Sequence, residues 1–240
     1  MKRPYVLLSV ATSLDGHIDD ATPERLILSN AEDLDRVDAE RAAADAILVG
    51  AATIAADDPR LLVRSAARRA ERVARGAPPS PIKVTITRTG RGLDPGAQFF
   101  TAGDGLKLVY VGGVGGPDAA PGTAPVAADR ERRLAGPVPA VGDLERRLAG
   151  LATVVVAPDL PAVLADLADR GVARLMVEGG TRTTTAFMTA GLVDELQVVV
   201  APLAVGDPAA PRLVAAPVDR MSLAEIRQVG DCALLVYRPR

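Results

Sequence analysis

The sequence predicts an α/β fold in which helices flank a mainly parallel central sheet. Three observations support this prediction. Short runs of Val, Leu and Ile, with the length of buried strands, recur along the chain. Most of them alternate with longer stretches that have helical spacing and capping residues. Two last runs, Leu223 to Val229 and Ala233 to Arg238, surround Gly230-Asp231 and indicate an antiparallel hairpin near the C-terminal end.

The composition is that of an ordinary globular protein. Of the 240 residues, 48% are hydrophobic and 24% are charged, which is enough for a substantial core. The sequence has no repeat and no clear domain boundary, so we expect one domain over residues 1–240. Three Phe, three Tyr and no Trp leave little for base stacking, and a net charge of −2 favours neither nucleic acid nor an anionic membrane.

Membrane, secretion and metal signals are missing from the sequence. No apolar run approaches the ~18 residues that cross a bilayer, and the first residues lack the apolar core of a signal peptide. Cys232 and His17 are the only residues of their kinds, which excludes an internal disulfide and leaves a structural zinc ion too few ligands. We expect a cytoplasmic protein without a bound metal.

The first predicted strand runs from Tyr5 to Ala11 and ends in the turn Thr12-Ser13-Leu14-Asp15-Gly16. Small hydroxyls and a glycine at this place suit the close approach of a cofactor, although Asp-Gly is common in any turn. A second short strand, Ala46 to Val49, is closed by Gly50 and more small residues. We therefore also expect Gly50 beside a cofactor.

Between these strands we predict a helix from Ala31 to about Ala44, with Ser29 and Asn30 available as caps. Spacings of three or four residues place several of its side chains on one face. They are Leu34, Val37, Arg41 and Ala44.

After Gly50, a short helical turn leads to Asp57-Asp58-Pro59 and then to Arg64. The two carboxylates could form a general acid and base, but adjacent side chains rarely face one site. Capping of the turn, with a ribose contact from one of them, is the more ordinary interpretation. Arg64 could hold a substrate phosphate or simply lie on the surface.

Residues Ser65 to Pro81 indicate a solvated helix followed by a Pro-rich linker. Because no aromatic residues accompany its arginines, we expect an exposed basic face rather than a nucleic-acid patch. These arginines are Arg68, Arg69, Arg72 and Arg75.

The next predicted strand, Ile82 to Thr87, ends at Arg88-Thr89-Gly90. Arg88 could bind the 2′-phosphate of an adenosine ribose, or it could belong to a turn that faces solvent. A strand from Leu106 to Val111 then enters a Gly- and Pro-rich stretch, Gly112 to Pro125, which we expect to be mobile.

The same signals predict the elements that precede the final hairpin. They are a helix from Asp143 to Leu148, a strand from Thr153 to Ala157, a helix from Leu160 to Arg170, a strand from Arg174 to Val177, a helix from Thr181 to Ala190 stopped by Gly191, and a long strand from Val193 to Pro202.

The most informative stretch is Glu178-Gly179-Gly180, at the corner between a strand and a helix. Two glycines let a ligand approach bare backbone, and a helix start supplies unpaired N–H groups that suit a phosphate or pyrophosphate. Glu178 would point into the crevice in which α/β sheets hold ligands. A capped helix without any ligand fits these residues equally well. Hydroxyl donors follow at Thr181, Thr183, Thr184 and Thr185.

Four groups of residues together resemble a known family. They are Arg3-Pro4-Tyr5-Val6 with Thr12-Ser13-Leu14-Asp15-Gly16; Arg41 with Asp45-Ala46-Ile47-Leu48-Val49-Gly50; the block Thr53 to Arg64; and Val177-Glu178-Gly179-Gly180 followed by Gly191-Leu192-Val193-Asp194-Glu195-Leu196 and Ala201-Pro202. From Pro4 to about Gly206 the chain resembles the reductase domain of the riboflavin-biosynthesis deaminase/reductase family, whose fold is like dihydrofolate reductase. The zinc-binding deaminase domain of that family is not found in this sequence, so we expect a stand-alone reductase.

The resemblance implies that NADPH reduces a phosphoribosylamino-pyrimidine, with hydride passing from nicotinamide C4 to C1′ of the opened sugar imine. No covalent nucleophile is expected, because the cofactor carries the chemistry. The resemblance also implies two sets of contacts. Ala11, Thr12, Thr53 and Asp57 would line the NADPH site, and Gly179 to Ala186, Arg182 included, would cradle its pyrophosphate. Arg41, Leu61, Arg64 and Glu178 would face the substrate, with the arginines near its phosphate.

Some residues depart from the family's pattern. Ser9 stands where many bifunctional members have a lysine, Ile27-Leu28-Ser29 replaces a Trp-Ile-Thr segment, and Thr87-Arg88 replaces an Asp-Ser pair. A reductase of dihydrofolate or another pterin, a secondary-metabolism reductase, and a binding protein that has lost the chemistry are the alternatives. We also predict a homodimer, because strands such as Val193 to Pro202 offer apolar edges that need covering and family members are commonly dimers.

Overall fold

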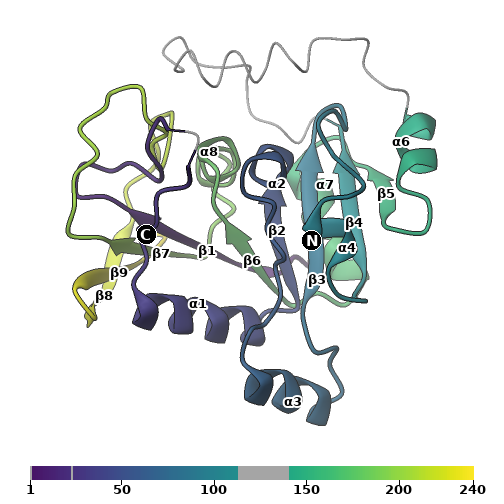
Figure 1. The fold of residues 1–240 in the computed structure, drawn as a ribbon, viewed down its shortest axis with the longest axis horizontal. Helices are drawn as coiled ribbons and strands as arrows, with labels where there is room; N and C mark the ends of the chain where they lie inside the picture. Colours follow the sequence, from purple (N-terminus) through teal and green to yellow (C-terminus); the bar gives the residue numbers. More distant parts are fainter. Residues whose placement is uncertain (1, 23, 113–140) are drawn as a thin grey trace.

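The computed structural model describes residues 2–22, 24–112 and 141–240 (Figure 1). Its strands form one nine-stranded sheet in the order β5-β4-β3-β2-β6-β1-β7-β9-β8. The strands are β1 (Tyr5–Thr12), β2 (Ala46–Gly50), β3 (Ile82–Thr87), β4 (Lys107–Val111), β5 (Thr153–Val156), β6 (Arg174–Glu178), β7 (Glu195–Val200), β8 (Ser222–Val229) and β9 (Cys232–Arg238). The described helices are α1 (Ala31–Ala43), α2 (Ala51–Asp57), α3 (Ala66–Ala74), α4 (Gln98–Thr101), α6 (Val141–Arg147), α7 (Leu160–Asp169) and α8 (Thr181–Thr189).

The α/β fold with a mainly parallel sheet is confirmed. All pairings from β5 to β7 are parallel, and β9 runs antiparallel to both β7 and β8, as the predicted hairpin requires. The short α4 was not predicted. Of the stretch Gly112 to Pro125, only Gly112 belongs to the described residues, so that prediction of mobility lies outside them.

Two apolar clusters cover the two faces of the sheet. On one face, Val163 and Leu167 of α7 and Phe187 of α8 pack against the strands. On the other face, Ile54 of α2, Phe99 of α4 and residues of α6 pack against them. Helices therefore flank both sides of the sheet, and α2 and α8 start side by side at one of its ends (Figure 1).

Helix α1 does not bury an apolar stripe. Val37 is partly buried and Ala44, just after the helix, is fully buried, but Leu34 is 37% exposed. The buried residues of the helix are instead Asp33 and Asp38. The face predicted to carry Leu34, Val37, Arg41 and Ala44 is therefore not uniformly buried, because the helix packs largely through charged side chains.

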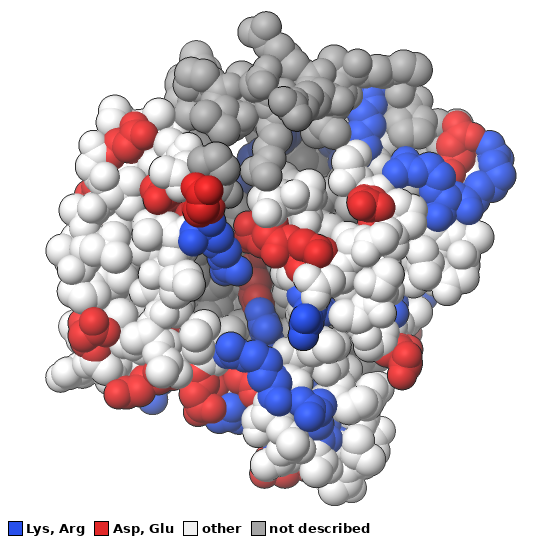
Figure 2. All heavy atoms as spheres, in the orientation of Figure 1, with Lys and Arg blue, Asp and Glu red and all other residues white. Residues whose placement is uncertain are grey.

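Helix α3 is not the exposed basic face that we expected from its arginines. Arg72 is only 2% exposed and donates to the carbonyls of Pro78, Ala42 and Ala44 at 2.7–2.8 Å. Arg68 pairs with two carboxylates of α1. These arginines hold α3 against α1, and Figure 2 shows the Lys and Arg side chains gathered at this junction. The sequence did not reveal this, because the carbonyls at the end of a helix leave no signal.

Strand β7 is shorter than predicted and is not an edge. It pairs with β1 on one side and β9 on the other. The open edge on this side of the sheet is β8, the outer strand of the hairpin, in which every residue except Val229 is exposed. The reason given for a dimer from Val193 to Pro202 is therefore wrong, since the hairpin returns to cover that strand.

We predict that Arg72→Ala lowers the free energy of unfolding by about 3 kcal/mol, because three carbonyl groups lose a charged donor in a buried place. Urea denaturation measures this. The matched control is Arg75→Ala: this exposed arginine of the same segment donates to the carbonyl of Ala42, and we expect a loss of about 0.5 kcal/mol or less. Equal losses of stability in the two variants would contradict the role of Arg72 in holding α3 against α1.

Candidate active site

The carboxyl ends of four neighbouring strands bring most of the predicted site residues together. The sheet order places β3, β2, β6 and β1 side by side, and they end at Thr87, Gly50, Glu178 and Thr12. Because these strands are parallel, all four ends lie at one edge of the sheet. The predicted cofactor and substrate residues, which are spread over the sequence from Ala11 to Ala186, converge there.

Helices α2 and α8 start at this edge without side-chain caps. The N-caps of α1, α3 and α7 are Asn30, Ser65 and Asp159, and each side chain accepts a backbone N–H. The N-caps of α2 and α8 are Gly50 and Gly180, and neither makes a side-chain cap hydrogen bond. A helix leaves its first backbone N–H groups without intrahelical acceptors. At α8 no N-cap side chain covers these groups, and the positive end of the helix dipole there favours an anion.

The glycines are required by contacts between the two helix starts. A Cβ at Gly50 would lie 2.5 Å from Oγ1 of Thr183, and a Cβ at Gly180 would lie 2.8 Å from Oγ1 of Thr53. Gly179 and Gly180 also have φ of +56° and +87°, which L side chains rarely adopt. Among the residues that the structure describes, none has an atom within 4 Å of a Cβ built on Gly179. Within this part of the chain, the corner is therefore closed between the helices and unobstructed at Gly179.

The hydroxyl groups of the α8 threonines differ in their hydrogen-bond partners. Thr181 donates its hydroxyl to the carbonyl of Arg212, and Thr185 donates to the carbonyl of Thr181 while accepting from the N–H of Ala215. Thr183 lies between the glycines, and Oγ1 of Thr184 is buried without a hydrogen-bond partner in the part of the chain that the structure describes. Two of the four hydroxyls thus fix the segment that follows Gly206. The last residue of the predicted cradle, Ala186, packs against the core.

Asp57 and Asp58 differ in their structural surroundings. Asp58 has a left-handed backbone with φ of 41°, and its carboxylate accepts from the backbone and side chain of Gln98 at the start of α4. Asp57 is the last residue of α2 and is half-buried. The geometry favours the capping interpretation over an acid–base pair. Leu61 has φ of 50° and is buried in the core, so it contributes a strained backbone next to the site rather than a free side chain.

Arg41 of α1 forms a two-pronged ion pair with Glu178. Its Nε and Nη2 each lie 2.6 Å from a carboxylate oxygen, and both side chains are 17% exposed. Burial lowers the pKa of Arg41, but the carboxylate of Glu178 raises it more, so the net shift of the pKa is upward. Arg41 also lies 3.4 Å from the carbonyl of Leu62. This pair ties α1, the end of β6 and the segment that leads to Arg64.

Ser9, which departs from the family pattern, lies in a polar row across the sheet. It is in register with Glu178 on one side and with Gln197 on the other. Arg36 of α1 donates to the side chains of both Gln197 and Ser9 and pairs with Asp33. The guanidinium of Arg36 therefore lies beside Ser9, the position at which many family members have a lysine. The sequence analysis did not identify Arg36. Its signal was only the spacing of Arg36 and Arg41 on α1.

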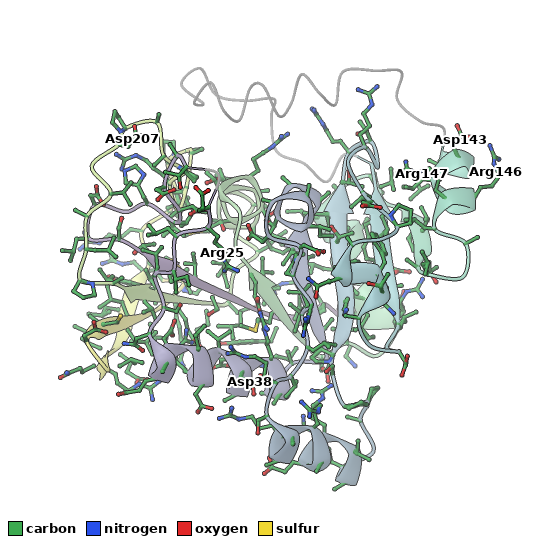
Figure 3. The ribbon with its side chains drawn as sticks, in the orientation of Figure 1. Arg25, Asp38, Asp143, Arg146, Arg147 and Asp207 are labelled. Carbon is green, nitrogen blue, oxygen red and sulfur yellow. The ribbon has the colours of Figure 1, made fainter. Side chains whose placement is uncertain are left out.

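Two more basic residues complete the edge. Arg25 is exposed and lies over the middle of the face of the molecule that Figure 3 shows, on the loop that precedes α1. Figure 2 shows that charged side chains of both signs line the middle of the same face. Arg88, which was predicted to read a 2′-phosphate, is exposed directly after the end of β3. Sequence analysis did not single out Arg25, because one arginine in an irregular loop has no pattern around it.

Within residues 2–22, 24–112 and 141–240, no three His, Cys, Asp or Glu residues gather in a way that could hold a metal ion. Among the helices of the same described residues, none combines the length and apolar character needed to cross a membrane.

Comparison with known proteins identifies the family to which this chain belongs. The family model described as RibD C-terminal domain matches residues 4–235. The chain is 35% identical over 204 residues to the 2,5-diamino-6-ribosylamino-4(3H)-pyrimidinone 5′-phosphate reductase of Archaeoglobus fulgidus, with 85% of this chain and 83% of the relative covered. It is 36% identical over 208 residues to the reductase of the same name from Methanothermobacter thermautotrophicus, with 85% and 80% covered.

Solved structures agree on the fold. RibD of Acinetobacter baumannii has a TM-score of 0.73 at 24% identity; the match covers 99% of this chain but only 58% of that chain. A pyrimidine reductase-like protein of Corynebacterium diphtheriae has a TM-score of 0.72 at 20% identity, with 98% and 91% covered. At these identities the likeness concerns the fold alone. From the family match and the two archaeal relatives, we conclude that the chain belongs to the RibD C-terminal domain family.

Proposed function

We propose that this chain, acting as a single domain, is an NADPH-dependent reductase of the riboflavin pathway that reduces a phosphoribosylamino-pyrimidine to its ribitylamino product. The observation that carries the proposal is the uncapped start of α8 at Gly179-Gly180, in a chain whose relatives are named pyrimidinone phosphate reductases. Such a corner suits the pyrophosphate of a dinucleotide.

The residues at the edge fit the cofactor. Gly179 itself has no Cβ to meet a pyrophosphate, and the backbone N–H groups at the start of α8 would face its charge. Close to this start, Oγ1 of Thr184 is a buried polar atom that has no hydrogen-bond partner among the described residues. Thr12 lies at the end of the neighbouring strand β1, and Thr53 lies on α2. Arg88 would lie nearest to the ribose end and favour NADPH over NADH by pairing with a 2′-phosphate.

The α1 side of the edge fits the substrate. Arg64 is half exposed, beside the segment that Arg41 contacts. A phosphate recruits guanidinium groups because their planar donors match its oxygens. Glu178 holds Arg41 in one orientation and gives the mouth of the site a fixed polar wall.

The chain's own residues would orient the reactants rather than form a bond to them. When bound, the nicotinamide cofactor supplies the hydride. The protein holds the two partners at a fixed distance and angle, which lowers the entropy cost of bringing them together. No side chain needs to act as a nucleophile in this reaction.

The relatives favour a riboflavin-pathway pyrimidine over a pterin. The names of the two archaeal reductases state a diamino-pyrimidinone phosphate substrate, and no observation at the site favours dihydrofolate. We therefore expect the diamino-pyrimidinone to be turned over, with the amino-uracil analogue as the competing substrate. A cytoplasmic location, expected from the sequence, belongs to the same proposal.

We predict that the purified protein oxidises NADPH in the presence of the diamino-pyrimidinone or amino-uracil ribosylamino phosphate, and at least ~100-fold more slowly with dihydrofolate, which has no phosphate for the arginines to bind. Loss of NADPH absorbance with each substrate measures this. A binding protein that has lost the chemistry would retain NADPH affinity without turnover, and faster turnover of dihydrofolate would overturn the substrate class.

We predict that Gly180→Ala raises the KM for NADPH at least ~10-fold, because the new Cβ meets Thr53 and the backbone must leave its φ of +87°. The control is Gly191→Ala at the far end of α8, where φ is also positive at +64° but no described residue has an atom within 4 Å of the added Cβ. Steady-state oxidation of NADPH gives the KM of each variant, and titration of NADPH fluorescence gives the matching affinity. An equal loss of affinity in both variants would mean that backbone strain alone, and not the α2–α8 contact, matters.

We predict a homodimer that uses β8. This strand is an open edge of the sheet, and its Leu223 and Ile226 are 49% and 65% exposed. Such edges are normally paired or covered. Light scattering at micromolar concentration should show a dimer, and Leu223→Glu/Ile226→Glu should convert it to a monomer, whereas Val73→Glu on α3, at a position 57% exposed, should not. A wild-type monomer would refute the prediction.

A further inference from the structure

Asp38 is a buried carboxylate that faces away from the sheet. It lies on α1, is 2% exposed, and points toward the segment that joins α2 to α3 (Figure 3). The backbone N–H of Arg64 lies 2.5 Å from Oδ1, and the N–H of Ser65 lies 3.0 Å from Oδ2. Nη1 of Arg68 donates to Oδ2 at 3.0 Å as well. Three donors thus converge on one side chain.

These contacts keep the carboxylate charged. Burial raises the pKa of Asp38, but the N–H groups of Arg64 and Ser65 and the guanidinium of Arg68 lower it more, so the net shift of the pKa is downward. Hydrogen bonds to an ionised acceptor are roughly twice as strong as neutral ones. The backbone at Arg64 is therefore held firmly by α1.

The side chain of Arg64 is half exposed, whereas its backbone N–H is held by the buried Asp38. Its Nε is 3.7 Å from Oδ1 of Asp38 and its side chain is 50% exposed. One guanidinium nitrogen donates to the carbonyl of Leu34, one turn before Asp38 on α1. A fixed backbone with a partly free guanidinium is the arrangement expected for a residue that must reach a ligand from a defined origin.

The rest of the segment is set by the same helix. Arg41, three residues after Asp38, pairs with Glu178 and contacts the carbonyl of Leu62. One turn of α1 therefore fixes both the mouth of the site and the approach of Arg64. A carboxylate that only joined α1 to α3 would need the contact with Arg68, but not two consecutive backbone N–H groups at the arginine that faces the substrate.

We propose that Asp38 is a positioning residue that sets the place of Arg64 and so determines the affinity for the phosphate of the substrate. This inference rests on the proposed function, because it takes Arg64 to bind the phosphate of a ribosylamino-pyrimidine. Asp38 itself touches neither substrate nor cofactor.

The test compares Asp38→Asn with Arg64→Ala and with the double variant in steady-state kinetics. We expect Asp38→Asn to raise the KM for the phosphorylated pyrimidine about 10-fold, because an amide nitrogen would face the N–H of Ser65, and to leave kcat and the KM for NADPH within about twofold. Arg64→Ala should raise the same KM at least as much. The double variant should be no worse than Arg64→Ala alone, since the effect of Asp38 passes through Arg64.

The control is Asp35→Asn, which removes the other, exposed carboxylate that pairs with Arg68 and lies on the same helix. It should leave all kinetic constants unchanged. If Asp38→Asn does not fold, Asp38→Glu keeps the charge but displaces it, and should give a smaller rise of the same KM. A lower kcat with unchanged KM, or additive effects in the double variant, would show a merely structural role and overturn the proposal.

Titration calorimetry with ribose 5-phosphate separates this inference from the proposed function. If neither pyrimidine is turned over, the reductase assignment fails. Equal weakening of ribose 5-phosphate binding by Asp38→Asn and Arg64→Ala would then still support the positioning role. If the pyrimidine is turned over but Arg64→Ala changes neither its KM nor the binding of ribose 5-phosphate, the reductase assignment stands and the role of Asp38 is refuted.

Discussion

The close approach of α2 and α8 is the constraint on which the site depends. The two helices follow neighbouring strands, β2 and β6, and leave the sheet edge toward opposite faces, which makes this edge a topological switch point. Their starts can meet only because Gly50 and Gly180 carry no Cβ: side chains there would lie 2.5 Å and 2.8 Å from threonine hydroxyls. The same lack of side chains leaves backbone N–H groups uncapped. Steric need and anion binding therefore select the same residue type.

Charge, rather than apolar packing, places the second wall. Helix α1 lies over β6, β1 and β7, where Arg36 donates to Gln197 of β7 and Ser9 of β1 and Arg41 pairs with Glu178 of β6. An ion pair in a buried place is stabilising only when its geometry is good and its other donors are satisfied. The Arg41–Glu178 pair meets this condition with two short contacts. The pair fixes the distance between helix and strand at the place where we propose that substrate binds.

The sequence predicted the strands and most helices well, because buried parallel strands are short apolar runs and their ends carry glycine. It also identified the Glu178-Gly179-Gly180 corner, since two glycines before a helix are a local signal. It failed where the cause is not local. Arg72 looked solvated because its acceptors are carbonyls 28 and 30 residues away in the chain. Helical spacing alone could not show that Leu34 is exposed while Asp38, one turn later on the same helix, is buried. Arg36 and Arg25 acquire meaning only once β1 and β7 lie beside α1.

We propose that the glycine corner and helix α1 hold two reactants so that hydride passes directly from cofactor to sugar. The most direct measurement uses NADPH that carries deuterium at nicotinamide C4 and locates the label in the product by mass spectrometry and NMR. We expect a single deuterium at C1′ of the ribityl chain, from one of the two C4 positions only. Product without label at C1′, or label from both positions, would contradict it.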